Sequence, residues 1–161
     1  MSDIDSKLDA LGLTLPKPIQ LPPGVVLPFA WVRLHGDRAY VSGHVALNAD
    51  GSLATPLGKV GAELTLEEGY RAARLTGLAM LASLKRELGD LDRVSLWLRA
   101  FGMVNSGPAF DRYPLVINGF TDLIIELWGP ERGGHARSAV GLAGLPFGAA
   151  VEIEAEVAIR T

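Results

Sequence analysis

The chain has 161 residues, of which 48% are hydrophobic and 20% charged, and this balance predicts one globular domain with a sizeable core. It contains no cysteine, which excludes disulfides and thiolate chemistry and fits a reducing, cytoplasmic location. The net charge of −3 and the scattered basic residues argue against a nucleic-acid binder, and no window approaches the ~18 apolar residues of a membrane span.

The first 24 residues are predicted to form an N-terminal extension ahead of a single domain at residues 25–161. Two interpretations of residues 2–13 stay open: a short amphipathic helix capped by Ser2, or a frayed tail. Residues 15–28 are rich in proline, cannot form a helix and predict an extended lead-in. The acidic N-terminus lacks the basic region and the apolar run of a signal peptide.

The domain begins with strand patterns. Residues 29–35 and 38–44 flank Gly36-Asp37, which predicts a hairpin. A turn follows, and a short strand is expected at residues 53–54.

Two long helices are predicted next along the chain. The first begins at the capping box Thr65–Glu68, carries leucines spaced at three and four residues, and ends at Gly89. The second covers residues 113–128, has Pro114 in its first turn, and stops at Gly129-Pro130.

Three further strands are predicted at residues 93–104, 136–144 and 150–159. In the first of them, alternation places Val94 and Trp97 on opposite faces. The element order β-β-β-α-β-α-β-β predicts an α+β fold, in which a mixed sheet carries both helices on one face.

The other face of such a sheet would need a cover of its own. Trp31, Val41 and Trp97 are expected on it. Because an exposed apolar sheet face usually marks an interface, this pattern gives a weak indication of assembly.

An arginine and a glutamate stand out in the last two strands. Arg137 lies among small apolar residues, where a guanidinium is costly to desolvate unless an anion meets it. Two interpretations stay open: a structural ion pair with Glu152 or Glu154, or a fork that grips a ligand carboxylate. The alternating Glu152, Glu154 and Glu156 share one face, and such a pattern usually forms a solvated strand surface.

This part of the chain resembles the closing signature of the YjgF/RidA family, and the likeness covers roughly residues 25 to 160. It rests on the combination of several segments rather than on any single one. These segments are Tyr40–Gly43, Gly58–Gly61, Thr65–Tyr70, Leu91–Val94, Val104-Asn105, Ile117–Gly119, Arg137–Gly141, Leu145-Pro146 and Val151–Ala155. The resemblance implies a chorismate-mutase-like fold and a homotrimer with sites between subunits.

The resemblance also implies a reaction. Arg137 would bind the carboxylate of a 2-imino or enamine acid, and Glu152 would orient or activate a water. Because an imine carbon is already electrophilic, hydrolysis to a 2-keto acid and ammonia would need only these groups, with no metal or cofactor.

Five further positions correspond to the family's pocket, and two of them carry different residues. Gly43, after Ser42, would lend a backbone N–H to the substrate, and Asn118 would lie near it or serve only as a structural helix residue. Phe29 stands where many relatives carry Tyr, and Ala139 where many carry Cys. These two differences indicate a branch with a more apolar pocket.

The histidines are a separate question. His135 would point the same way as Arg137 and could assist the water, or it is an ordinary surface residue. His35, His44 and His135 are too dispersed for a metal site, and no glycine-rich phosphate loop precedes a helix.

Two other functions stay open. A non-catalytic binder of small carboxylic acids would use the same pocket. Ribonuclease, an activity for which some members of the family are named, would need a basic track that this acidic chain lacks.

Overall fold

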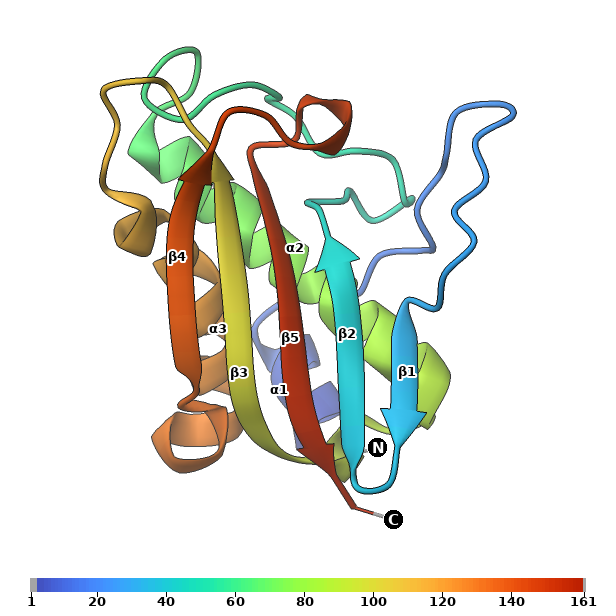
Figure 1. The fold of residues 1–161 in the computed structure, drawn as a ribbon. Coiled ribbons are helices and arrows are strands. Elements are labelled where there is room, and N and C mark those ends of the chain that lie inside the picture. Colours follow the sequence, from blue (N-terminus) through green and yellow to red (C-terminus); the bar gives the residue numbers. More distant parts are fainter. Residues whose placement is uncertain (1–2, 161) are drawn as a thin grey trace.

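A five-stranded mixed sheet forms one layer of the molecule, and helices cover one of its faces (Figure 1). The computed structural model describes residues 3–160. The strand order is β1-β2-β5-β3-β4, with β3 and β4 parallel and all other neighbours antiparallel. In chain order the helices and strands are α1 (Asp3–Ala10), β1 (Val32–His35), β2 (Arg38–His44), α2 (Leu66–Leu88), β3 (Val94–Asn105), α3 (Tyr113–Gly133), β4 (Ala136–Leu142) and β5 (Val151–Ile159).

The predicted α+β architecture is confirmed, with both long helices on the same face of the sheet (Figure 1). The strand expected at residues 53–54 is wrong, because Leu53 forms only an isolated bridge with Leu47. The short N-terminal helix exists as α1, whose first backbone N–H groups donate to the carboxylate of Asp92. Ser2, its expected cap, lies outside the described residues.

Local signals fixed the ends of the two long helices. The Thr65 hydroxyl accepts from the backbone N–H of Glu68, whose carboxylate accepts from the N–H of Thr65. This capping box satisfies two donors at the start of α2. Gly89 ends α2 with a φ of 80°, and Gly129 interrupts α3 with a φ of 77°, so that only one further turn follows Pro130.

Strand β3 departs from regular alternation. Its pairing with β5 shifts twice, between Val94 and Leu96 and again between Trp97 and Arg99. Each shift inserts one residue into β3, and because the first lies between Val94 and Trp97, both of these residues face the helices. The prediction that Trp97 and Val41 lie on the uncovered face was therefore wrong, since both are buried beneath the helices.

Strand β2 contains a similar bulge near its end. Val41 pairs with Ala155, but His44 pairs with Ile153, so β2 has one residue more than β5 over this stretch. The extra residue turns the His44 side chain into the protein, where it is 5% exposed.

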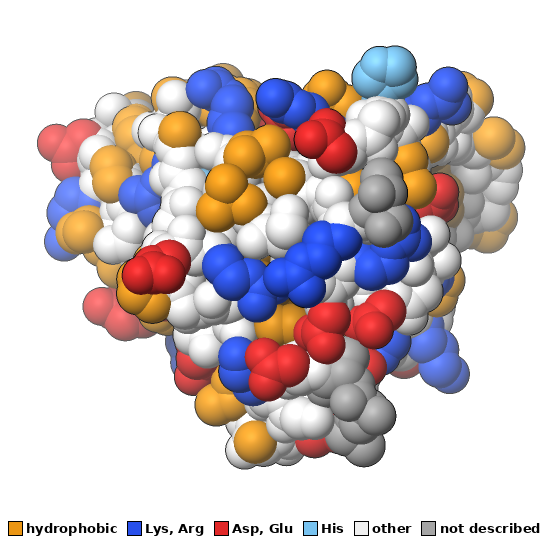
Figure 2. All heavy atoms as spheres, turned by 90° about the horizontal axis from the view of Figure 1, so that it is seen from below, with side chains coloured by type: hydrophobic (Ala, Val, Ile, Leu, Met, Phe, Trp, Pro, Cys, Tyr) orange, Lys and Arg blue, Asp and Glu red, His pale blue; other side chains and the backbone are white. Residues whose placement is uncertain are grey.

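Charges of both signs lie on the end of the molecule that carries the β1–β2 hairpin. In Figure 2 positive and negative side chains lie side by side there, rather than as one continuous basic surface. No helix within residues 3–160 is long and apolar enough to cross a membrane.

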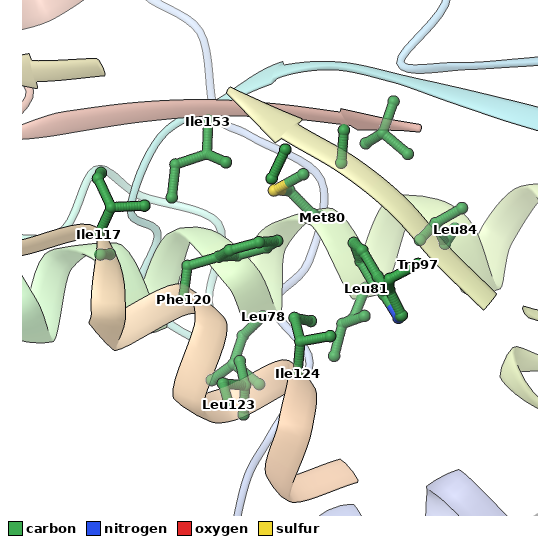
Figure 3. Close-up of a cluster of buried hydrophobic side chains, with 14 of the residues drawn as sticks. Leu78, Met80, Leu81, Leu84, Trp97, Ile117, Phe120, Leu123, Ile124 and Ile153 are labelled. Carbon is green, nitrogen blue, oxygen red and sulfur yellow. The ribbon is translucent and has the colours of Figure 1, made fainter. Parts of the chain in front are cut away.

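The core lies between the sheet and the two long helices (Figure 3). Trp97 packs edge-to-face against Phe120 and Trp128, with ring centroids 5.6 and 5.5 Å apart. This packing holds α3 against β3 and so fixes the residues that α3 presents to the neighbouring strand β4.

Candidate functional site

A cavity of about 420 Å³ opens where β2 ends, between the proline-rich lead-in, α2 and the β4–β5 connection. This volume lies within the range of small-ligand sites. Most of its wall is apolar, and its polar residues are few. The apolar side chains include Ile19, Leu27, Phe29, Trp31, Val45, Leu47, Ala79 and Phe147, and the polar ones are His44, Ser83, Arg86 and Glu152.

Glu152 is the unpaired acid of this cavity. It is half-buried, and no other residue in the described chain forms a hydrogen bond or ion pair with its carboxylate. Burial raises the pKa of Glu152, and the charge of Glu154 raises it further. A carboxylate held this way can accept a proton more readily than an exposed one.

Gly43 allows this carboxylate to lie where it does. A Cβ atom at position 43 would overlap the Glu152 Oε1 atom, so only glycine lets the acid lie across the end of β2. The neighbouring Ser42 donates its hydroxyl to the carbonyl of Ala30 at 2.7 Å, which ties β2 to the lead-in. Phe29 lies on the same cavity wall and packs edge-to-face on Trp31 at 4.9 Å.

His44 forms part of a hydrogen-bonded chain in the cavity wall. Its Nδ1 lies 2.6 Å from the carbonyl of Ser42, which can only accept, so Nδ1 carries the proton. Nε2 then accepts from the Ser83 hydroxyl at 2.8 Å, and Ser83 accepts from Arg86 at 2.8 Å. Burial lowers the pKa of His44 to about 4, so the ring is neutral at pH 7.

Arg137 points away from this cavity, toward α3. Its Nη1 donates to Asn118 Oδ1 at 3.0 Å and to Thr121 Oγ1 at 2.9 Å, and its Nη2 donates to the carbonyl of Pro114 at 3.2 Å. All three acceptors are neutral. The ion pair with Glu152 or Glu154, one of the two interpretations from the sequence, does not form within residues 3–160.

His135 extends the Arg137 network. Its Nδ1–H donates to the carbonyl of Gly133 at 2.7 Å, so Nε2, at 3.1 Å, accepts from Thr121. Burial lowers the pKa of His135, and the charge of Arg137 lowers it further. The side chain points toward α3 as Arg137 does, as the alternation of this strand predicted. Ala139 lies on the same side and packs against the core.

The strand register places Arg137 and Glu152 on opposite faces of the sheet. Arg137 is opposite Ala100 of β3, which is buried under the helices, whereas Glu152 is opposite Met103. Ala100 and Met103 are three residues apart in a regular stretch, so their side chains point to different faces. One chain therefore presents two separate groups: the Glu152 cluster (Phe29, Gly43 and Glu152) and the Arg137 cluster (Asn118, Thr121, His135 and Arg137).

Several residues of these clusters were not identified from the sequence. In the sequence, nothing distinguishes Thr121 and Ser83 from other polar helix residues. Their roles become visible only when the strands packed beside them are known. Phe147 is the one non-glycine residue in the described chain with a positive φ, 60°, and no sequence pattern indicated this conformation. No group of three or more His, Asp or Glu side chains in residues 3–160 is placed to hold a metal ion.

Comparisons with known proteins agree with this fold. A family model described as "YjgF/chorismate mutase-like, putative endoribonuclease" matches residues 5–152. Protein TCP17 of Trypanosoma cruzi is 45% identical over 125 residues, which cover 78% of this chain and 77% of that protein. The crystal structure of Atu1372 from Agrobacterium tumefaciens, of unknown function, matches with a TM-score of 0.86 and 38% identity, over 98% of this chain and 92% of that one. E. coli TdcF with bound serine matches with a TM-score of 0.59 over 90% and 99% of the two chains, and at 19% identity this is a likeness of fold alone.

Proposed function

Because the chain belongs to the YjgF/chorismate mutase-like family, we propose that it hydrolyses 2-imino or enamine acids to 2-keto acids and ammonia. The observation that carries this proposal is Glu152, a half-buried carboxylate without a protein partner at the edge of a ligand-sized cavity. The serine bound by E. coli TdcF, which shares the fold, supports a small carboxylic acid as the ligand.

Hydrolysis of an imine needs only a few catalytic groups from the protein. Glu152 accepts a proton from a water, and the oxygen of that water bonds to the electrophilic imine carbon. The π electrons of the C=N bond move to the nitrogen, which takes up the proton from Glu152 and gives a carbinolamine. The proton of the new hydroxyl group then moves to the nitrogen, the C–N bond breaks as the C=O bond forms, and ammonia and the 2-keto acid are released. Arg137 holds the substrate carboxylate with two parallel hydrogen bonds, and Phe29 packs beside the substrate.

The separation of the two clusters supports an assembly in which two subunits share a site. Since one chain presents Arg137 and Glu152 on opposite faces, we place the partner subunit's Arg137 against the Glu152 cluster of the first. The homotrimer implied by the family resemblance would repeat this contact three times. In each site the substrate carboxylate would take the place of neutral oxygen atoms that now accept hydrogen bonds from Arg137.

Replacing Glu152 with glutamine tests the proposed role directly. We expect Glu152→Gln to lower kcat/KM for imine hydrolysis by roughly 10²-fold or more, because the amide cannot accept the water's proton. The wild-type rate should fall on acidification, with the midpoint above the ordinary pKa of a glutamate because burial raises the pKa of Glu152. Keto-acid release from imines generated in situ by an amino-acid oxidase measures both effects.

A matched control is available on the same strand face. Glu154→Gln should keep turnover and move the acid limb slightly toward lower pH, because it removes a nearby negative charge. If Glu152→Gln hydrolysed imines at the wild-type rate, the proposed role of Glu152 would be wrong.

Gly43 gives a second test of the same geometry. Gly43→Ala should lower kcat/KM by roughly tenfold or more, because the added methyl group displaces the Glu152 carboxylate. Gly144→Ala is the control, since a Cβ at that position meets nothing within 4 Å. Equal activity of the two alanine variants would show that the position of the carboxylate does not matter.

A non-catalytic binder of small carboxylic acids is the second candidate. It is favoured by Phe29 and Ala139, which lack the hydroxyl and thiol that many relatives carry at these positions. Calorimetry with 2-ketobutyrate beside the turnover assay separates the two functions. Binding without any acceleration of imine hydrolysis would support the binder.

A further inference from the structure

We infer that the cavity beside Glu152 accepts a bulky apolar side chain of the substrate, so that the preferred acids carry a branched aliphatic or aromatic group. This inference rests on the proposed function, and it adds the class of substrate.

The cavity is larger than a small imino acid requires. At about 30 Å³ for each water-sized group, 420 Å³ holds about 14 such groups, which is about twice the size of a four-carbon imino acid. The reacting atoms must remain near Glu152. The rest of the volume therefore lies on the side-chain end of the substrate.

The walls of this remaining volume are apolar and offer almost no free hydrogen-bonding group. Both ring nitrogens of His44 are already bonded, and Ser83 donates to His44 while accepting from Arg86. Arg86 lies at the exposed rim. Away from that rim, a polar side chain would lose its hydrogen bonds to water and find few partners, whereas each buried methylene would favour binding by about fourfold.

The rim of the cavity contains a strained aromatic residue. Phe147 has a φ of 60° and a ψ of 16°, a left-handed conformation that is costly for a bulky side chain. Hydrogen bonds from Gly148 to Leu145 and from Ala149 to Pro146 hold the turn in this form. Such strain is concentrated at ligand sites, and here it places an aromatic ring on the cavity wall.

The lead-in supplies the opposite wall. Lys17 and Gln20 donate backbone N–H groups to the carbonyls of Ala49 and Gly51, and these bonds hold Ile19 over the cavity. Phe29, at the end of the lead-in, is 48% exposed although it is a large apolar ring. A bound apolar group would cover surface that is otherwise in contact with water.

The test compares a small and a bulky ligand in two assays. In turnover, we expect kcat/KM for the imine derived from leucine to exceed that for the imine derived from alanine by roughly tenfold or more. In calorimetry, 4-methyl-2-oxopentanoate should bind more tightly than pyruvate by a similar factor. The binding arm needs no catalysis, so it remains informative if the proposed reaction fails.

Two variants narrow the cavity from different sides. Ile19→Trp on the lead-in and Ala79→Leu on α2 should each lower the bulky-to-small ratio by roughly tenfold. Val26→Trp is the control, because Val26 lies on the same lead-in, is 79% exposed and does not line the cavity. The bulky-to-small ratio of Val26→Trp should equal that of the wild type. Thermal unfolding of each variant is measured to test that it is folded.

The outcomes distinguish this inference from the function it rests on. Imine hydrolysis with no preference for the leucine-derived substrate would overturn the inference and leave the proposed function standing. Tighter binding of 4-methyl-2-oxopentanoate without hydrolysis would support the cavity's role and overturn the proposed function. Equal binding of both keto acids by the wild type and by the two narrowed variants would overturn the inference.

Discussion

Mixing an Arg137→Ala variant with a Glu152→Gln variant is expected to restore turnover that neither protein has alone. Arg137→Ala should lower kcat/KM by roughly 10³-fold, because the substrate carboxylate loses a charged, two-pronged partner. The two residues lie on opposite faces of one sheet, so a site that needs both must draw them from two subunits. In mixed oligomers some sites combine the intact arginine of one variant with the intact glutamate of the other.

Random mixing sets the size of this effect. About a quarter of the sites would hold both intact residues, so about a quarter of the wild-type rate should return after the two variants are refolded together. The control mixes Arg137→Ala with a chain that carries both substitutions, where no intact site can form. Recovery in the control, or no recovery in the test mixture once subunit exchange is shown by tagged chains, would contradict a shared site.

The stability of the protein is expected to fall by about 3 kcal/mol between pH 6.5 and pH 4 through His44 alone. The pKa of His44 is about 4 in the folded protein, below its ordinary value of 6.5, chiefly because the ring is buried. Between these values the unfolded chain binds the proton and the folded chain does not. The stability is therefore fully present above pH 6.5 and is lost as the pH falls through this window.

Urea unfolding of the wild type and of His44→Gln across this range measures the effect. The variant should be less stable at pH 7, because it loses the bonds to Ser42 and Ser83, but its stability should depend less on pH. Some dependence will remain, since burial also lowers the pKa of His135. His35→Gln, an exposed change at the hairpin, serves as the control, and an equal slope for His44→Gln and the wild type would contradict the assignment.

Local signals made much of the fold predictable. The capping box Thr65–Glu68 and the terminating Gly89 are contained within a few residues of sequence, and both bounded α2 correctly. The hairpin at Gly36-Asp37 was predictable for the same reason. These features depend on the local backbone conformation and on hydrogen bonds between residues close in sequence, so a few neighbouring residues determine them.

The position of Trp97 was not predictable from alternation. The first of two bulges in β3 brings Val94 and Trp97 to the same face, and a bulge depends on pairing with β5, more than fifty residues away in sequence. The same limit applies to Arg137 and Glu152. Alternation gave the face of each within its own strand, but β3 lies between their strands, and only the sheet order shows that the two side chains point to opposite faces.

The residue inserted in β2 makes strand length as important as strand composition. Without the bulge, regular pleating from Val41 to His44 would bring the imidazole out on the far side of the sheet. Ser83 would lose its acceptor, and Gly43 would no longer lie against Glu152. The cavity wall therefore depends on how many residues β2 has at this point as well as on which residues they are, because the bulge brings His44 and Gly43 to their positions.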